Sequence, residues 1–416
     1  MSLRVVSGAG LLVFAGLAWL ISENRRNVDW RLVGWGLTLQ LLIGIVMLKT
    51  PLEGRVFRCM QGLVDVLNDS TAAGASFVFG GLTERFVIKA GALVDHEGDR
   101  VINAALAFHV LPVIIFVSAI TAILYHLRIV QGAVRFITWA MRRTLKTSGA
   151  ETFGAALLIF LGIESVTAIR VYLKDMTRSE LCTLMTAFMA TIAGSVMVVY
   201  AAFGAEPGHL LAASLMSAPA AIVMAKIMVP ETGEPTTRGR VRVSVPVTTH
   251  NVVDAAAQGT SDGLRLALNV GAMLITFIGL VYLCNLILGA LIGFTLVDIM
   301  RCLFMPFACL LGVPWQDVGA VSEMLGTKTV LNEFLAYLRL QELIGEGSLS
   351  PRSVTIATYA LCGFANPGSL GILIAGLTGL APERRKDIVQ LGLRSLVGGT
   401  LACFMTAAIA GILVDA

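Results

Sequence analysis

Two glutamates lie inside long apolar segments, where an ionised side chain is costly in a membrane protein. Glu164 lies in ALLIFLGIESVTAI (156–169) and Glu333 in VLNEFLAYL (330–338). A charge at the centre of a membrane helix costs at least about 2.5–3.5 kcal/mol, so such residues face polar cavities and mark transport paths. The two carboxylates therefore predict one polar transport site, shared between two separate segments within the membrane.

The composition indicates a membrane protein. Hydrophobic residues make up 56% of the 416 residues and charged residues only 14%, whereas soluble domains have about 25% charged residues. The basic residues cluster in short loops and do not form the Lys/Arg stripe with an aromatic platform that nucleic-acid binding needs. The seven cysteines show neither a CxxC pair nor metal-ligand spacing, so we expect no metal site and no cofactor.

Eight segments are long and apolar enough to be spans of an all-α polytopic membrane protein. They cover residues 4–22, 32–50, 109–127, 180–203, 208–229, 263–292, 352–379 and 389–414. The mixed segment 51–108 is expected to form interfacial helices around a Gly-rich turn. Segment 128–146 alternates arginines with apolar residues and is also expected to lie at the interface.

Two further apolar segments are expected to be re-entrant hairpins. Segment 148–174 has basic clusters on both sides, so the positive-inside rule places both of its ends in the cytoplasm, with Gly162 at the tip. Segment 315–345 is too polar for a lipid-exposed span and is expected to enter from the opposite face. Within it, Glu323 and Lys328 are expected to form a local ion pair.

Each hairpin is followed by a span with a polar break, so the chain contains an inverted repeat. The breaks are ATIAGS (190–195) and FANPGS (364–369), and such repeats place the substrate near the bilayer midplane. In the second break Pro367 and Gly368 interrupt the helix. Asn366 and Ser369, with the two glutamates, suit a hydroxyl-rich neutral molecule such as a sugar. We expect three parts: N-terminal helices (1–108), the first half of the core (109–260) and the second half (261–416).

The chain resembles the concentrative nucleoside transporter family over essentially its full length. The resemblance is carried by LAFHVLPVIIFVSAITAILYHL (106–127), LALNVGAMLITFIGL (266–280), GTKTVLNEFLAY (326–337) and ALCGFANPGSLGILIAGL (360–377). It implies a homotrimer in a bacterial cytoplasmic (inner) membrane, each protomer having a scaffold and a mobile transport domain. It also implies uptake of nucleosides with a coupling ion by alternating access.

The resemblance also implies roles for individual residues. Glu333, Asn366 and Ser369 match the positions that hold the ribose. Gly162 and Glu164 match the hairpin tip that faces the base. Val196 and Phe364 match the remaining positions of the family's substrate pocket.

Two departures from the family pattern concern specificity and coupling. The family reads Gly-Gln-x-Glu at the first hairpin, and this chain reads Gly162-Ile163-Glu164, which leaves the base preference open. Sodium-coupled members have an asparagine where this chain has Leu158, which cannot ligate a cation that takes oxygen ligands. Thr191 keeps a hydroxyl at the family's serine position and is the candidate ligand. The coupling ion is therefore sodium or a proton.

Other interpretations stay open from the residues alone. The solute could be a modified nucleoside or a nucleobase, and the protein could be a passive channel. Glu333 could form a structural ion pair with Lys328 or Arg339, Asn366 could only cap a helix, and Thr191 could bond to the carbonyl four residues earlier. An enzyme is not expected, because the sequence contains neither HExxH nor GxSxG.

Overall fold

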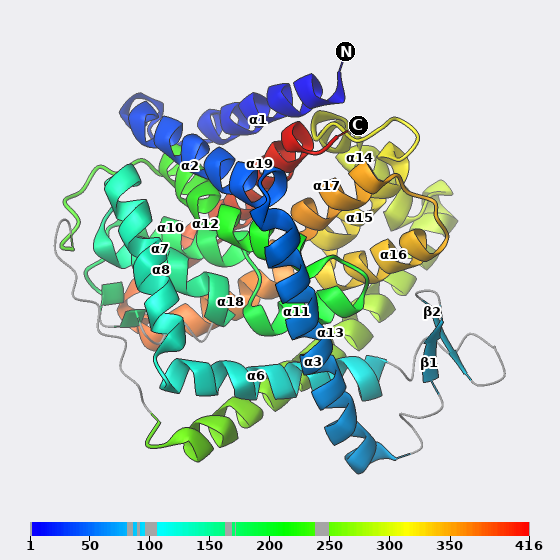
Figure 1. Cartoon of the computed structure of the whole chain (residues 1–416). Helices are drawn as coiled ribbons and strands as arrows, with labels where there is room; N and C mark the ends of the chain where they lie inside the picture. Colours follow the sequence, from blue (N-terminus) through cyan, green and yellow to red (C-terminus); the bar gives the residue numbers. More distant parts are fainter. Residues whose placement is uncertain are drawn as a thin grey trace.

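The computed structural model describes residues 2–80, 86–89, 92–95, 106–162, 169–170, 172–237 and 249–415. This part of the chain is helical apart from one two-stranded β-hairpin (Figure 1). The predicted all-α polytopic fold with two re-entrant helical hairpins is therefore confirmed. The N-terminal part contains α1 (Leu3–Leu20), α2 (Trp30–Lys49) and α3 (Leu52–Phe79).

The β-hairpin corrects one expectation. Strands β1 (Phe86–Lys89) and β2 (Ala92–Asp95) pair antiparallel, with Phe86 opposite Asp95. Segment 51–108 was expected to form interfacial helices around a Gly-rich turn, and that expectation is wrong at these two strands. Valine and isoleucine favour strands, and two such runs separated by a short Gly-containing link are the local pattern of a hairpin.

The rest of the chain has the same order of elements twice. In each half a first helix is followed by a connecting helix, a hairpin, a broken span and a final helix. The first half contains α6 (Leu111–His126), α7 (Ile129–Leu145), α8 (Gly149–Leu161), α10 (Arg178–Ala190), α11 (Gly194–Ala202) and α12 (Pro207–Met228). The second contains α13 (Val252–Ile292), α14 (Leu296–Leu310), α15 (Val318–Val330), α16 (Glu333–Gly345), α17 (Pro351–Leu361), α18 (Pro367–Leu380) and α19 (Arg385–Leu413).

The described residues form six helices that are long and apolar enough to span a membrane, or seven if a bent pair counts as one span. Two of the spans predicted from the sequence are not single straight helices in the structure. Span 109–127 is α6, which bends by 74° into α7. Span 352–379 is divided into α17 and α18, each too short alone, because the chain unwinds between Leu361 and Pro367.

The hairpin helices cross only part of the membrane. Helices α8, α15 and α16 have 13 residues each, which gives a length of about 20 Å against a hydrocarbon core of about 30 Å. Helices α15 and α16 pack against each other around a turn at Leu331. Helix α8 starts with a capping box of Ser148 and Glu151 and ends at Gly162.

The core is built around α12. Almost all of this helix is buried, and it packs against α10, α19 and α2. Its many alanines and serines allow close helix approach, as is usual inside membrane bundles. Helix α13 instead crosses α6 through small residues: a Cβ on Gly259 would lie 2.7 Å from the Ser118 carbonyl oxygen.

Charged residues gather at two opposite ends of the spans. At one end Glu23 binds Arg178 at 2.9 Å and Arg394 at 3.3 Å, so the α1–α2 turn meets α10 and α19. At the other end Asp415 binds Lys49 at 3.1 Å and also binds Arg4.

Candidate functional site

Glu333 is the centre of the candidate site. Its side chain is buried, and both of its oxygens accept short hydrogen bonds. Tyr200 donates its hydroxyl to Oε1 at 2.8 Å, and Asn366 donates its amide to Oε2 at 2.8 Å. The predicted neighbours Glu333 and Asn366 are therefore in direct contact. Neither Lys328 nor Arg339 forms an ion pair with Glu333, so the ion-pair interpretation is wrong.

Asn366 combines capping with a second contact. Its Oδ1 accepts from the Ser369 backbone N–H at 2.8 Å and so caps α18, while its Nδ2 binds Glu333. The hypothesis that Asn366 only caps a helix is therefore wrong. The Ser369 hydroxyl has no hydrogen-bond partner among the described residues, which leaves it available to a ligand.

The two helix breaks touch each other. The Phe364 backbone N–H donates to the Thr191 carbonyl at 3.3 Å. A Cβ on Gly363 would lie 2.9 Å from the Ala190 carbonyl carbon and 2.5 Å from Cys403 Sγ. The unwound segments of the two repeats therefore cross with no room for a side chain between them.

The helix ends at the site favour negative charge. Helix α16 begins at Glu333 and α18 begins at Pro367, directly after Asn366. Partial positive charge at helix N-termini stabilises an anionic group nearby. Discontinuous helices with this arrangement are the usual binding elements of inverted-repeat transporters.

Tyr200 is a site residue that the sequence interpretation missed. It lies in α11 and is fully buried, and its ring stacks on Tyr337 with centroids 4.3 Å apart. Tyr337 is itself fixed by a 2.8 Å bond from its hydroxyl to the Thr358 carbonyl. A tyrosine in an apolar span was the only signal, and it does not specify a partner 133 positions away.

The first hairpin is described only up to its tip. Gly162 has φ +54 and ψ −142, a conformation that essentially only glycine adopts. Glu164 and Ile163 lie outside the described residues. Of the other pocket candidates, Val196 is buried in α11, and the half-buried Phe364 ring lies 5.8 Å from the Phe188 ring.

The candidate ion position contains one free oxygen. Thr191 is buried, and its Oγ1 has no hydrogen-bond partner, so the back-bonding interpretation is wrong. Leu158 is fully buried in the apolar core and offers no ligand. Among the described residues no group of three His, Cys, Asp or Glu side chains could hold a metal ion.

The charged residues of the second hairpin pair differently from expectation. Glu323 binds Arg339 at 3.1 Å, whereas Lys328 is fully buried and donates to the Ala360 carbonyl at 2.7 Å. The expected Glu323–Lys328 pair is therefore wrong. Ala360 lies in the last turn of α17, where free carbonyls favour a cation, so Lys328 holds the end of the broken helix.

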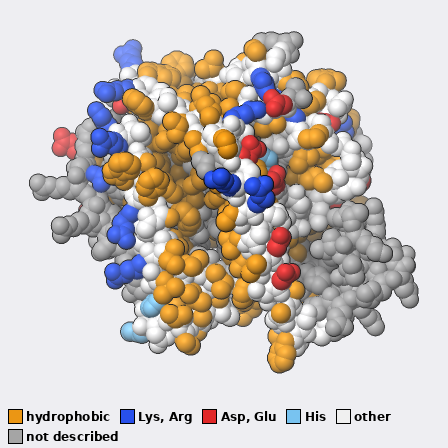
Figure 2. All heavy atoms as spheres, in the orientation of Figure 1, with side chains coloured by type: hydrophobic (Ala, Val, Ile, Leu, Met, Phe, Trp, Pro, Cys, Tyr) orange, Lys and Arg blue, Asp and Glu red, His pale blue; other side chains and the backbone are white. Residues whose placement is uncertain are grey.

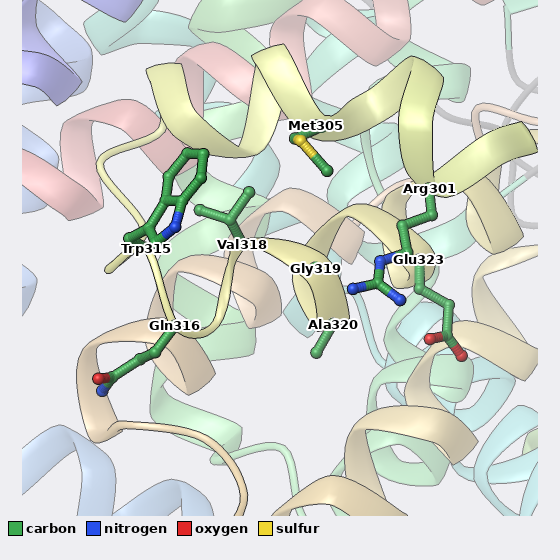
Figure 3. A pocket seen from close by; sticks show the side chains of 8 residues that line it. All are labelled: Arg301, Met305, Trp315, Gln316, Val318, Gly319, Ala320 and Glu323. Atoms are coloured by element: carbon green, nitrogen blue, oxygen red, sulfur yellow. The ribbon is translucent and has the colours of Figure 1, made fainter. Parts of the chain in front are cut away.

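A surface cavity of about 400 Å³ lies elsewhere, between α14 and α15. Arg301, Trp315 and Glu323 are among the residues that line it (Figure 3). It contains none of the predicted substrate residues, and Trp315 is 79% exposed. This cavity is therefore separate from the site around Glu333.

The fold and the site together define a polytopic membrane transporter built from an inverted repeat with two hairpins. Sequence profiles agree: "Na+ dependent nucleoside transporter N-terminus" matches residues 9–82, "Nucleoside recognition" matches 107–207 and "Na+ dependent nucleoside transporter C-terminus" matches 209–411.

Known proteins match the chain over nearly all of its length. The uncharacterized transporter YutK of Bacillus subtilis is 41% identical over 413 residues, covering 97% of this chain and 98% of YutK. Solute carrier family 28 member 3 of Mus musculus is 41% identical over 434 residues, 99% of this chain, which spans 59% of the length of that relative. The solved structure of CNTnw in an inward-facing substrate-bound state has a TM-score of 0.91 at 34% identity, covering 99% of this chain and 100% of CNTnw.

The chain belongs to the concentrative nucleoside transporter family, as its sequence motifs predict. This family consists of transporters rather than enzymes.

Proposed function

We propose that this protein takes up nucleosides across the cytoplasmic membrane by symport with a cation. The observation that carries the proposal is the Glu333 carboxylate, held by Tyr200 and Asn366 between two helix N-termini. The family membership supports the same substrate class.

The geometry suits a ribose. A carboxylate has about four lone-pair positions, and the described contacts use one on each oxygen. The remaining positions can accept the two neighbouring hydroxyls of a ribose, while the free Ser369 hydroxyl adds a donor or acceptor. Gly162 and Glu164, with Val196 and Phe364, are proposed to contact the base.

The coupling cation is proposed to be sodium or a proton. Family descriptions favour sodium, since the matching profile and the rat relative, sodium/nucleoside cotransporter 1, are both named for it. In this chain the free Thr191 hydroxyl supplies one oxygen, but the apolar Leu158 supplies none. Proton coupling is therefore the alternative that the residues favour.

The assembly is proposed to be a homotrimer in the bilayer. Helix α13 buries only its small-residue stripe and Leu274 and exposes many large apolar side chains, with Ile275 at 79% and Leu291 at 75%. Such a helix needs lipid or another copy on its outer side. We propose that the two halves, 109–260 and 261–416, form the transport core and that 1–108 supports it; native mass spectrometry tests the trimer.

Glu333→Gln tests the site. The change weakens the acceptor for ribose hydroxyls, so uptake of labelled uridine or adenosine into proteoliposomes should fall nearly to background while the protein stays folded. Glu342→Gln is the matched control, because this carboxylate lies on the same helix with a half-exposed side chain. Wild-type uptake by Glu333→Gln would show that the wrong residue is assigned.

The same proteoliposomes separate the remaining alternatives. Sodium and proton gradients imposed one at a time identify the coupling ion, and accumulation abolished by an ionophore excludes a passive channel. Competition by free ribose and free bases distinguishes nucleosides from nucleobases or modified nucleosides. Absence of saturable nucleoside uptake under both gradients would overturn the proposal.

A further inference from the structure

Helix α7 has three sides instead of the two of an ordinary surface helix. Its first side faces the core: Val130, Val134 and Met141 are buried. Val130 and Val134 pack in one apolar cluster with Phe153 and Leu157 of α8. The core side of α7 therefore supports the first arm of the first hairpin.

The second side is basic. Arg135 and Arg142 of α7 are spaced by seven residues, which places them within about 20° of one another around the helix. Arg128 lies directly before the helix and Lys146 directly after it. Helix α7 contains no acidic residue, and none of these four cations forms an ion pair with a described residue. Within the described part of the chain, this basic stripe is therefore not neutralised by an acidic side chain.

The third side is apolar and exposed. Ile129 is 57% exposed, Phe136 is 68% exposed and Trp139 is 58% exposed. The Phe136 and Trp139 rings stack with centroids 6.2 Å apart. A helix with exposed aromatic residues beside a basic stripe is suited to lie in the lipid headgroup region.

The second repeat provides an internal comparison. Helix α14 holds the equivalent place before the second hairpin, and its charged residues are Asp298 and Arg301, so its net charge is zero. Helix α7 with its flanking residues has five positive charges: Arg128, Arg135, Arg142, Arg143 and Lys146. Support of a hairpin therefore does not require the basic stripe.

Membrane insertion also does not account for the arrangement. The positive-inside rule depends on how many basic residues lie near a span and not on their alignment along one side of a helix. Figure 2 shows Lys and Arg side chains along the left edge of the molecule, beside exposed hydrophobic ones, and α7 lies at this edge in Figure 1.

We propose that α7 is a binding surface for anionic phospholipid headgroups. The arginine stripe pairs with lipid phosphates, while Ile129, Phe136 and Trp139 lie among the upper acyl chains. Because the core side of α7 packs on α8, bound lipid steadies the helix that supports the first hairpin.

The test measures lipid retention directly. Native mass spectrometry of the full chain is performed after addition of phosphatidylglycerol or phosphatidylcholine. Arg135→Gln/Arg142→Gln should lower the retention of phosphatidylglycerol on the order of tenfold and leave that of phosphatidylcholine unchanged. The matched control is Arg55→Gln/Arg58→Gln in α3, which removes the same charge from a helix that also contains Glu53, Asp65 and Asp69.

A second measurement uses only the wild-type protein, so it does not depend on the folding of a variant. Increasing salt should weaken phosphatidylglycerol retention and not phosphatidylcholine retention, because exposed charges are screened. Equal retention of the two lipids, or an equal loss in both double variants, would overturn the proposal. Neither outcome bears on nucleoside transport.

Discussion

At the scale of the residue, the Glu333 carboxylate is held before any substrate arrives. Tyr200 and Asn366 each occupy one of its oxygens at 2.8 Å, so its orientation does not have to be fixed during binding. An acceptor that is already oriented loses less entropy when a ligand binds. Tyr200 and Asn366, which hold the carboxylate in place, are therefore as important as the carboxylate itself.

Tyr200→Phe removes one of these donors without changing the shape of the ring. Loss of a hydrogen bond to a charged group costs about 1.5–3 kcal/mol, so we expect nucleoside affinity to fall at least tenfold, measured by isothermal titration calorimetry. Tyr359→Phe is the control, because Tyr359 is equally buried but contacts His209. Unchanged affinity of Tyr200→Phe would contradict the positioning role.

The residues of the site differ in how far the sequence predicts them. Asn366 could be predicted beside Glu333, because both lie at interruptions of apolar segments, and the discontinuous helices of such transporters meet at the substrate site. Tyr200 and Lys328 could not, because their partners depend on tertiary packing. Lys328 is held by a backbone carbonyl, and no spacing of side chains in the sequence reveals such a contact.

At the scale of the element, the point where the helix breaks after α10 and after α17 cross should leave no room for an added side chain. Gly363→Ala places a methyl group 2.9 Å from the Ala190 backbone, whereas Gly371→Ala in α18 meets nothing within 4 Å. We expect the first change to reduce uptake strongly and the second to leave it near the wild-type level. Equal uptake by both variants would show that the breaks can separate freely.

The base of the first hairpin depends on a buried ion cluster that the sequence did not predict. Lys226 at the end of α12 binds Glu151 of α8 at 2.8 Å, Glu231 at 3.1 Å and Ser179 of α10 at 3.0 Å. Three elements of the first repeat and the segment after α12 therefore meet at one ammonium group.

Lys226→Met should leave the Glu151 charge buried without a partner. Removing one member of a buried pair costs about 3–5 kcal/mol, so the unfolding temperature in detergent should fall markedly. The double variant with Glu151→Gln should recover part of this loss, because Gln still caps α8. Lys174→Met, at a side chain that is 69% exposed, should have little effect. No change in Lys226→Met would contradict a stabilising role of the cluster.

Elements were predictable where their pattern is local. Unbroken apolar spans such as α12 and α19 follow directly from hydropathy. The strands β1 and β2 were missed because they are four residues long within a segment of mixed polarity. The division of span 352–379 was indicated by Pro367, but the extent of unwinding depends on contacts with the other repeat.

At the scale of the whole molecule, Glu23 joins the α1–α2 turn to α10 and α19. The hydrogen bond from Arg178, with the nearby charges of Arg178 and Arg394, lowers the pKa of Glu23 despite partial burial. A carboxylate with a lowered pKa in the folded state stabilises the fold above its unfolded pKa and loses this effect as the pH falls through its folded pKa.

Glu23→Gln should therefore lower the unfolding temperature at neutral pH. The difference from the wild type should shrink as the pH falls below the ordinary range of a glutamate and vanish once Glu23 is protonated in both states. Thermal unfolding of both proteins between pH 7 and acid conditions measures this. A difference that grows on acidification would contradict the sign of the effect.

The contacts of Asp415 also determine whether the chain crosses the membrane an even or an odd number of times. Arg4 near the start and Asp415 near the end bind each other, and Lys49 binds the same carboxylate. Both ends therefore lie on one side of the membrane, and a chain with this property crosses an even number of times. Seven crossings are excluded. Among the described residues, the six helices of sufficient length, together with α6 and the interrupted pair α17–α18, make eight.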